Sequence, residues 1–256
     1  MPLFALDAVR NAPVDHAIEI LLEEMRGQVA AFPFPQRAGL DTVEDALQVY
    51  DQARPRFNVI LSLLTGTAGK RGADISTGFG FLPALLAAVG AEISGTEIDT
   101  GLAAFAASRG IEIIRYRIGE TPYFALDQSL DFVVLGEVLE HLKQPPVRVV
   151  QEVSRALRPG GKFILTTPNV SRLAHIEALA AGENFLEPFP ESIAPGRDAT
   201  DSIEHVREYS IREVVDAVEG AGLAIDHVLM TGWGQNGYNP LASPYANEIM
   251  VVSATK

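Results

Sequence analysis

Apolar residues in the first part of the chain recur every three to four positions, the spacing of one face of an amphipathic helix. The spacing is clearest over Ile18, Leu21, Leu22, Met25 and Val29. Asp15 stands where an N-cap is expected, and Pro33 and Pro35 follow where a helix has to end. The pattern predicts a first helix between Asp15 and Pro33.

Two further helical segments are expected before residue 67. Asp41 and Glu44 have the spacing of a capping box, so a second helix is predicted to begin at Asp41. A separate segment from Arg56 to Leu64 is predicted to start just after Pro55, because proline is tolerated in a first helical turn and not in a helix interior. Residues 1–66 are therefore expected to form a helical appendage without strands, and residues 67–256 a second domain.

The pattern changes at Ala73 to short apolar runs that alternate with helical stretches. Strands are expected over 73–76, 91–97, 111–117, 130–135 and 162–167, and two closing strands over 224–232 and 247–254. Strands that alternate with helices are typical of βαβ units and a parallel sheet. The chain is thus predicted to have an α/β fold, a Rossmann-like, seven-stranded, mostly parallel sheet with helices on both faces.

Residues 171–204 interrupt this alternation. They begin with a stretch that is helical at best, and Pro188, Pro190 and Pro195 then punctuate an irregular segment. A long excursion inside a compact domain is usually a lid or a binding loop. We expect 171–204 to be a lid-like insertion at a binding site, followed by a helix over 210–219.

Composition excludes several classes of protein. The chain of 256 residues has no cysteine, so disulfide scaffolds, thiolate metal sites and cysteine nucleophiles are ruled out. Its net charge of −13 disfavours binding to nucleic acid or to an anionic membrane surface. No leader-like start and no apolar run of membrane-spanning length is present. The expectation is a soluble, cytoplasmic protein with a small-molecule ligand.

A glycine-rich turn follows the first predicted strand of the sheet, over Asp74–Gly80. Such a turn lets backbone N–H groups approach a ligand at the carboxyl ends of the strands. Glu97 ends the next strand, at about the offset where an acidic residue binds ribose hydroxyls. Pro83 stands in place of the third glycine of a dinucleotide motif, so a nucleoside without pyrophosphate fits better.

Four segments in matching order and spacing resemble the class I S-adenosylmethionine-dependent methyltransferases. They are Asp74–Gly80, Glu97, Leu130–Leu142 and Leu157–Gly161. The resemblance covers residues 68–170 and implies S-adenosyl-L-methionine as cofactor. It implies cofactor contacts for Asp74 at the methionine amine, Ser76, Gly78 and Gly80 at the methionine moiety, Glu97 at the ribose, Glu120 at the adenine, and Glu137. Ser76 departs from the glycine that is usual in the family.

A group of acidic and imidazole side chains offers chemistry beside this cofactor. Glu137 and Glu140 share a helix face, His141 follows, and His205 lies at the end of the insertion. Two carboxylates and two imidazoles suit Mg²⁺ or Mn²⁺. The segment also resembles small-RNA 2′-O-methyltransferases and ubiquinone-pathway O-methyltransferases, in which such residues hold a metal. The alternative is that His141 or His205 acts as a metal-free general base.

Acceptor contacts are expected from the insertion and from the loop between the last two strands. The candidate residues are Asn169, Phe185, Arg197, Trp233, Asn236 and Tyr238, which supply aromatic walls and hydrogen-bonding groups.

The leading functional hypothesis is O-methylation of a small molecule or a glycan precursor, with or without a divalent metal. The alternatives are an RNA 2′-O-methyltransferase and a non-catalytic nucleoside-binding or scaffold protein with the same fold. The net charge disfavours RNA. The N-terminal helices could cap the cofactor pocket or form a homodimer surface, and the sequence leaves both open.

Overall fold

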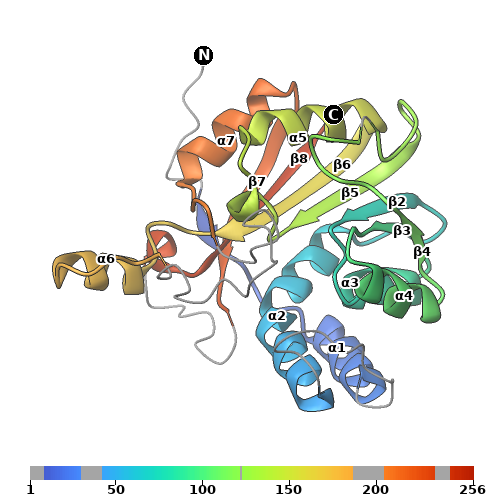
Figure 1. The fold of residues 1–256 in the computed structure, drawn as a ribbon, viewed down its shortest axis with the longest axis horizontal. Coiled ribbons are helices and arrows are strands. Elements are labelled where there is room, and N and C mark those ends of the chain that lie inside the picture. Colours follow the sequence, from blue (N-terminus) through green and yellow to red (C-terminus); the bar gives the residue numbers. More distant parts are fainter. Residues whose placement is uncertain (1–8, 30–41, 122, 187–204, 234–242) are drawn as a thin grey trace, which may run out of the picture.

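An eight-stranded sheet organises the protein. The computed structural model describes residues 9–29, 42–121, 123–186, 205–233 and 243–256. In these parts the strands are β1 (Arg10–Asn11), β2 (Arg71–Ile75), β3 (Glu92–Thr96), β4 (Glu112–Ile114), β5 (Leu130–Gly136), β6 (Leu157–Pro168), β7 (Ala224–Thr231) and β8 (Ile249–Thr255). Their order across the sheet is β1-β7-β8-β6-β5-β2-β3-β4. Figure 1 shows this sheet running through the middle of the molecule.

The pairing confirms the predicted, mostly parallel α/β sheet. All neighbouring strands are parallel except for β8, which runs antiparallel to both β6 and β7. The register aligns Ile75 with Thr96 and Leu135, and Gly136 with Thr166. Strands β2, β3, β5 and β6 therefore end at one edge of the sheet, and the residues that follow them lie together.

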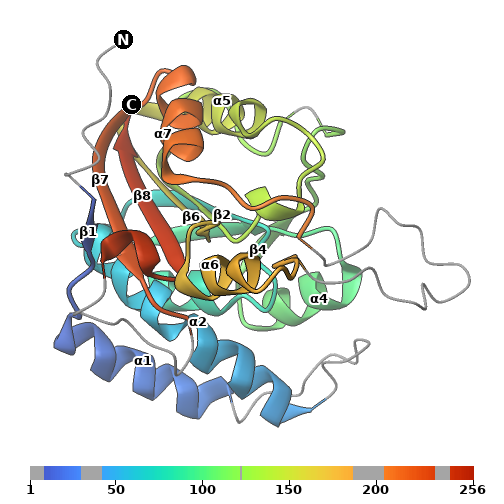
Figure 2. The same cartoon turned by 90° about the vertical axis from the view of Figure 1, so that its left-hand side faces the viewer.

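Helices cover both faces of the sheet. They are α1 (His16–Val29), α2 (Val43–Leu63), α3 (Phe81–Ala88), α4 (Thr100–Ser108), α5 (Pro146–Ala156), α6 (Leu173–Ala180) and α7 (Ile211–Gly220), with short 3₁₀ helices at Leu139–His141 and Pro244–Ala246. Figure 2 shows α5 and α7 on one side and α1, α2 and α4 on the other. None of the helices in the described residues is both long and apolar enough to cross a bilayer.

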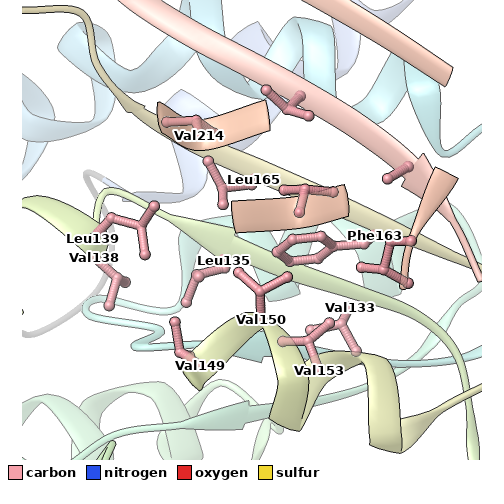
Figure 3. Close-up of a cluster of buried hydrophobic side chains, with 14 of the residues drawn as sticks. Val133, Leu135, Val138, Leu139, Val149, Val150, Val153, Phe163, Leu165 and Val214 are labelled. Carbon is pink, nitrogen blue, oxygen red and sulfur yellow. The ribbon is translucent and has the colours of Figure 1, made fainter. Parts of the chain in front are cut away.

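Successive residues of β5 contribute side chains to two hydrophobic clusters, one on each face of the sheet, because strand side chains alternate between faces. Val133 and Leu135 point to the α5 and α7 side, where they pack with Val150 and Val214 (Figure 3). Phe132 and Val134 point to the other face and join the cluster that contains side chains of α1, α2 and α3. Both faces of the central strands are thus buried, as expected for a parallel sheet.

The N-terminal part contains a strand that the sequence pattern did not predict. Arg10 and Asn11 pair with Leu229 and Met230 of β7. This edge strand raises the number of strands in the described residues from the predicted seven to eight. The first helix does begin after Asp15, whose carboxylate accepts hydrogen bonds from the backbone of residues 17 and 18.

Residues 43–63 form one continuous helix, so the predicted break at Pro55 was wrong. Tyr50 before the proline and Phe57 and Ile60 after it are all buried, in the same hydrophobic cluster as side chains of the sheet. This burial on both sides of Pro55 outweighs the missing hydrogen bond. The capping box of the helix is Thr42 with Asp45, one position later than predicted.

The N-terminal helices also share their core with the sheet. Leu22 and Tyr50 belong to the same buried cluster as Phe132 of β5 and Val251 of β8. The division at residue 66 remains a prediction. Of the predicted insertion, residues 173–180 form α6, and 187–204 lie outside the described residues.

Candidate functional site

The turn after β2 is coiled tightly enough to require unusual backbone conformations. Ser76, Gly78 and Gly80 all have positive φ, of 61°, 57° and 72°. The Ser76 N–H donates to the hydroxyl of Thr96 at 3.0 Å, which ties the turn to the end of β3. A glycine fits this conformation without strain, so Ser76 is held in it against its steric preference.

Glu97 is fixed beside the turn by three backbone donors. Its Oε2 accepts from the Gly78 N–H at 2.9 Å, and its Oε1 accepts from the N–H groups of Ile98 and Asp99 at 2.7 and 2.9 Å. The sequence placed Asp74, the glycine turn and Glu97 at one sheet edge, and the structure brings them together there. Glu120, by contrast, is exposed and lies 3.4 Å from Arg117.

Arg56 reaches the same edge from α2, and the sequence pattern contained no signal for it. Its guanidinium Nη1 lies 3.4 Å from Oε2 of Glu137 and makes no hydrogen bond although it is buried. The guanidinium carbon also lies 5.3 Å from the ring centroid of Trp233, a cation–π contact. A helix that was expected to be an appendage thus supplies a cation to the site.

Asp74, the residue before the last one of β2, carries a buried carboxyl group. Burial raises its pKa to about 7, the nearby charge of Arg56 and a hydrogen bond from Thr77 counteract this, and the carboxylate of Glu97 adds to it. Asp74 is therefore poised between its neutral and charged forms near neutral pH. An arriving cationic group would shift it to the charged form.

Glu137 follows β5 in a left-handed conformation, with φ of 54°. Its Oε1 accepts from the hydroxyl of Thr166 at 2.7 Å, and its Oε2 faces Arg56. The structure does not bring Glu137 into the group of candidate metal ligands. Its carboxylate instead connects the ends of β5 and β6 to the cation from α2.

The other three predicted ligands, Glu140, His141 and His205, do meet. One potential ligand atom from each lies within 4.8 Å of the others. The rings of His141 and His205 are 5.1 Å apart between centroids, in an edge-to-face arrangement. The cluster follows β5 on one side and precedes α7 on the other, next to Glu137 and the cofactor candidates.

The carboxyl group of Glu140 is buried and only half satisfied. Its Oε2 accepts from the Thr167 hydroxyl at 2.9 Å, whereas its Oε1 has no hydrogen-bond partner and lies 3.9 Å from Nε2 of His141. Burial, followed by the charge of Glu137, raises the pKa of Glu140 well above its usual value. An unpartnered buried carboxylate oxygen needs either a proton or a cation, so the donor set fits a divalent metal.

The segment that carries His205 is bonded to the turn that carries Glu140. The N–H groups of Val206 and Arg207 both donate to the Glu140 carbonyl, at 2.7 and 3.2 Å. Nδ1 of His205 lies 2.9 Å from Oε1 of Glu208, a residue that sequence reasoning missed. Burial favours the neutral form of Glu208, but the hydrogen bond from His205 and the charge of Arg172 outweigh it and lower its pKa.

The structure describes three of the six candidate acceptor contacts, Asn169, Phe185 and Trp233. Asn169 is fully buried, and its amide donates to the carbonyls of Tyr245 and Asn247, so it holds the backbone together. Phe185 stacks on His175 with ring centroids 4.3 Å apart. Trp233 lies against Arg56, while Arg197, Asn236 and Tyr238 lie outside the described residues.

Comparisons with known proteins relate the chain to methyltransferases. Residues 73–165 match the sequence model of a methyltransferase domain. A ubiquinone biosynthesis O-methyltransferase of Cupriavidus pinatubonensis is 28% identical over 72% of this chain and 70% of that protein. A probable S-adenosylmethionine-dependent methyltransferase of Mycolicibacterium smegmatis is 29% identical over 63% of this chain, and the match spans 55% of that relative's length.

Solved structures share the fold. An S-adenosylmethionine-dependent methyltransferase from Thermotoga maritima superimposes with a TM-score of 0.56 at 20% identity, over 79% of this chain and 88% of the other. Phosphoethanolamine N-methyltransferase 2 of Haemonchus contortus, in complex with S-adenosyl-L-methionine, gives a TM-score of 0.53 at 17% identity, over 78% of this chain and 52% of the other.

Proposed function

Because the chain belongs to the class I S-adenosylmethionine-dependent methyltransferases, we propose that it methylates a hydroxyl oxygen of a small molecule or glycan precursor. The observation that carries this proposal is the group Glu140, His141 and His205, which lies beside the cofactor candidates at the carboxyl edge of the sheet. Methylation of a hydroxyl needs a group that removes its proton, and this group offers two imidazoles. The O-methyltransferases among the relatives support the same reaction.

Three residues would contact the cofactor, and a fourth would position one of them. Asp74 would bind the amino group of the cofactor's methionine part, and Glu97 the ribose hydroxyls. Arg56, whose buried Nη1 has no hydrogen-bond partner, would bind the methionine carboxylate. Glu137 would keep Arg56 in place through their ion pair.

S-adenosylmethionine supplies, when bound, an electrophilic methyl group on a positively charged sulfur. The protein's part is to align the acceptor oxygen with that methyl group and to accept the hydroxyl proton. His205 would take the proton at Nε2, since its Nδ1 is engaged with Glu208. His141, at ring contact with His205, would line the same position.

A divalent cation would give the same cluster a second way to act. Glu140, His141 and His205 would hold Mg²⁺ or Mn²⁺, and the metal's charge would lower the pKa of a hydroxyl bound to it. The unpartnered Oε1 of Glu140 favours this version, because a cation would satisfy it. Glu137 is not assigned to the metal, since its two oxygens contact Thr166 and Arg56.

Calorimetric titration of S-adenosylhomocysteine tests the cofactor part. Saturable binding is expected for the unmodified protein, and its loss for Glu97→Ala. Glu92→Ala, at the opposite end of the same strand, is the matched control and should bind normally. No saturable binding by the unmodified protein would overturn the proposal.

Binding of Mn²⁺, followed by electron paramagnetic resonance, separates the two versions of the cluster. A bound signal that His205→Gln removes and His227→Gln keeps supports the metal version; His227 is exposed and lies beside Arg10. No bound signal supports the metal-free base. Methyl transfer to a panel of phenols and catechols, with amines as the comparison, then tests the hydroxyl acceptor.

A further inference from the structure

Glu208 is a buried carboxylate that the proposed reaction does not use directly. Its side chain is 2% exposed, and its Oε1 lies 3.0 Å from a guanidinium nitrogen of Arg172 and 2.9 Å from Nδ1 of His205. Arg172 is always a cation and a donor, so it stabilises the charged form of Glu208. The contact to His205 is therefore a charge-assisted hydrogen bond.

The direction of this hydrogen bond decides which nitrogen of His205 carries hydrogen. An ionised carboxylate only accepts, so Nδ1 of His205 must donate. A neutral His205 then carries its hydrogen on Nδ1, and its Nε2 has a free lone pair. Only an imidazole nitrogen with a free lone pair can accept a proton or bind a metal.

The second oxygen of Glu208 has a different neighbour. Nδ1 of His175 lies 3.4 Å from Oε2 and 3.2 Å from the carbonyl oxygen of Val170. The carbonyl only accepts, so Nδ1 of His175 also carries hydrogen, and burial lowers the pKa of His175. On the far side, Glu248 lies 3.4 Å from Nε of Arg172. In the described residues, His175, Arg172 and Glu248 are thus the titratable and charged groups on the Glu208 side of the pair, and Glu140 and His141 are those beside the His205 ring.

The segment that carries His205 and Glu208 is held by backbone hydrogen bonds, which do not involve the two side chains. Bonds from Val206 and Arg207 to the Glu140 carbonyl hold the segment, and the Tyr209 carbonyl accepts from the N–H of Val170. These bonds position the backbone and leave the imidazole of His205 free to turn about its own side-chain bonds. The ring also contacts His141 edge to face, but the hydrogen bond to the Glu208 carboxylate is the interaction that distinguishes its two nitrogens.

We propose that Glu208 is a positioning residue that holds His205 as its Nδ1–H tautomer and so keeps Nε2 available for the acceptor hydroxyl or a cation. The inference rests on the role of His205 in the proposed function. The tautomer of His205 is, however, a property of the protein without ligands, so it can be tested without cofactor, acceptor or metal.

The test is nitrogen-detected NMR of the full chain, labelled with ¹⁵N in its histidines. The spectra are recorded in the presence of a chelator, at a pH about two units above the usual histidine pKa. A pyrrole-like Nδ1 and a pyridine-like Nε2 are expected for His205. Glu208→Ala should remove this pattern and move His205 to the Nε2–H form that neutral imidazole favours in water. Glu208→Gln keeps an accepting oxygen and should restore the Nδ1–H form at least in part.

Glu248→Gln is the matched control, because it changes a charge next to Arg172 without touching His205. It should leave the His205 signals unchanged. An Nε2–H form in the unmodified protein would overturn the proposal, and so would an unchanged His205 in a folded Glu208→Ala. If Glu208→Ala does not fold, the unmodified protein and Glu208→Gln still decide. Failure to bind S-adenosylhomocysteine would instead count against the proposed function alone.

Discussion

The guanidinium of Arg56, in the middle of helix α2, lies 3.4 Å from a carboxylate oxygen of Glu137, the residue that follows β5. The pair joins a helix near the N-terminus to the centre of the sheet. Arg56 also acts on the charge of Asp74 at the end of β2. The N-terminal helices therefore take part in building the proposed cofactor site as well as the core.

Replacement of Arg56 should weaken cofactor binding. Hydrogen bonds to charged groups contribute about 1.5–3 kcal/mol, so Arg56→Met is expected to lower affinity for S-adenosylhomocysteine by roughly 10- to 100-fold. Calorimetry measures the change. Arg54→Met is the control, because Arg54 on the same helix contacts Glu19 and Glu23 away from the site. Equal affinities of Arg56→Met and the unmodified protein would refute the assignment.

Cofactor affinity should depend on pH through Asp74. Its pKa is raised to about 7, so part of the protein must lose a proton before the carboxylate can bind the cofactor's amine. Affinity for S-adenosylhomocysteine is expected to rise up to about pH 7 and then to level off. Asp74→Asn should bind more weakly and without this rise. A flat profile for the unmodified protein would contradict the role of Asp74.

The same group makes stability depend on pH with a defined sign. The folded-state pKa is above the unfolded value, so the neutral form of Asp74 stabilises the fold at low pH and the benefit is lost as the pH rises through about 7. Asp74→Asn should be more stable than the unmodified protein above pH 7. The difference should shrink toward the unfolded-state pKa, and urea unfolding across this range measures it. A difference that grows with acidity would be the opposite sign.

Glycine at position 76 should stabilise the fold. Ser76 has a φ of 61°, which costs about 1–2 kcal/mol for a residue with a Cβ, while glycine costs about 0.5–1 kcal/mol in chain entropy. Ser76→Gly is expected to raise the free energy of unfolding by about 0.5–1 kcal/mol in urea titrations. Ser76→Ala keeps the Cβ and should give no gain. An equal gain from both variants would rule out backbone strain as the cause.

Two glycine-to-alanine changes should have opposite effects. A Cβ at Gly72 would lie 2.2–2.6 Å from ring atoms of the buried Phe132, whereas a Cβ at Gly27 in α1 meets nothing within 4 Å. Gly72→Ala should destabilise by about 1–3 kcal/mol through overpacking. Gly27→Ala should stabilise by about 0.5–1 kcal/mol, because alanine is the better helix former. Thermal and urea unfolding measure the change in stability of each variant. A stabilised Gly72→Ala or a destabilised Gly27→Ala would contradict the prediction.

Much of the architecture could be predicted because its signals are local. The strand over Leu130–Gly136 contains the apolar run from Phe132 to Leu135, and the glycines at 78 and 80 mark a turn that few other residues can adopt. Parallel strands end at one edge, so Asp74 and Glu97 were expected to meet there, and they do. A local pattern also placed Glu140 and His141 just beyond β5.

Contacts between distant segments were decided by the tertiary structure. Pro55 predicted a break, yet burial on both sides of it keeps α2 continuous and delivers Arg56 to the site. Arg56 in turn pairs with Glu137, whose carboxylate is not part of the group formed by Glu140, His141 and His205. The role of Glu208 could not be predicted from the sequence, because its contacts depend on how the segment after the insertion packs against the end of β6 and the start of α6.

The sequence by itself determined the order of the elements, the sheet edge at which the candidate ligand residues gather and, through its resemblance to a family, the class of cofactor. Periodicity and turn chemistry act over a few residues and can be seen in the chain. The tertiary structure decided which charges face each other, because a side chain's partners depend on how helices and strands far apart in sequence pack. The pairings of Arg56 with Glu137 and of His205 with Glu208 arise in this way, and they set the chemistry proposed for the site.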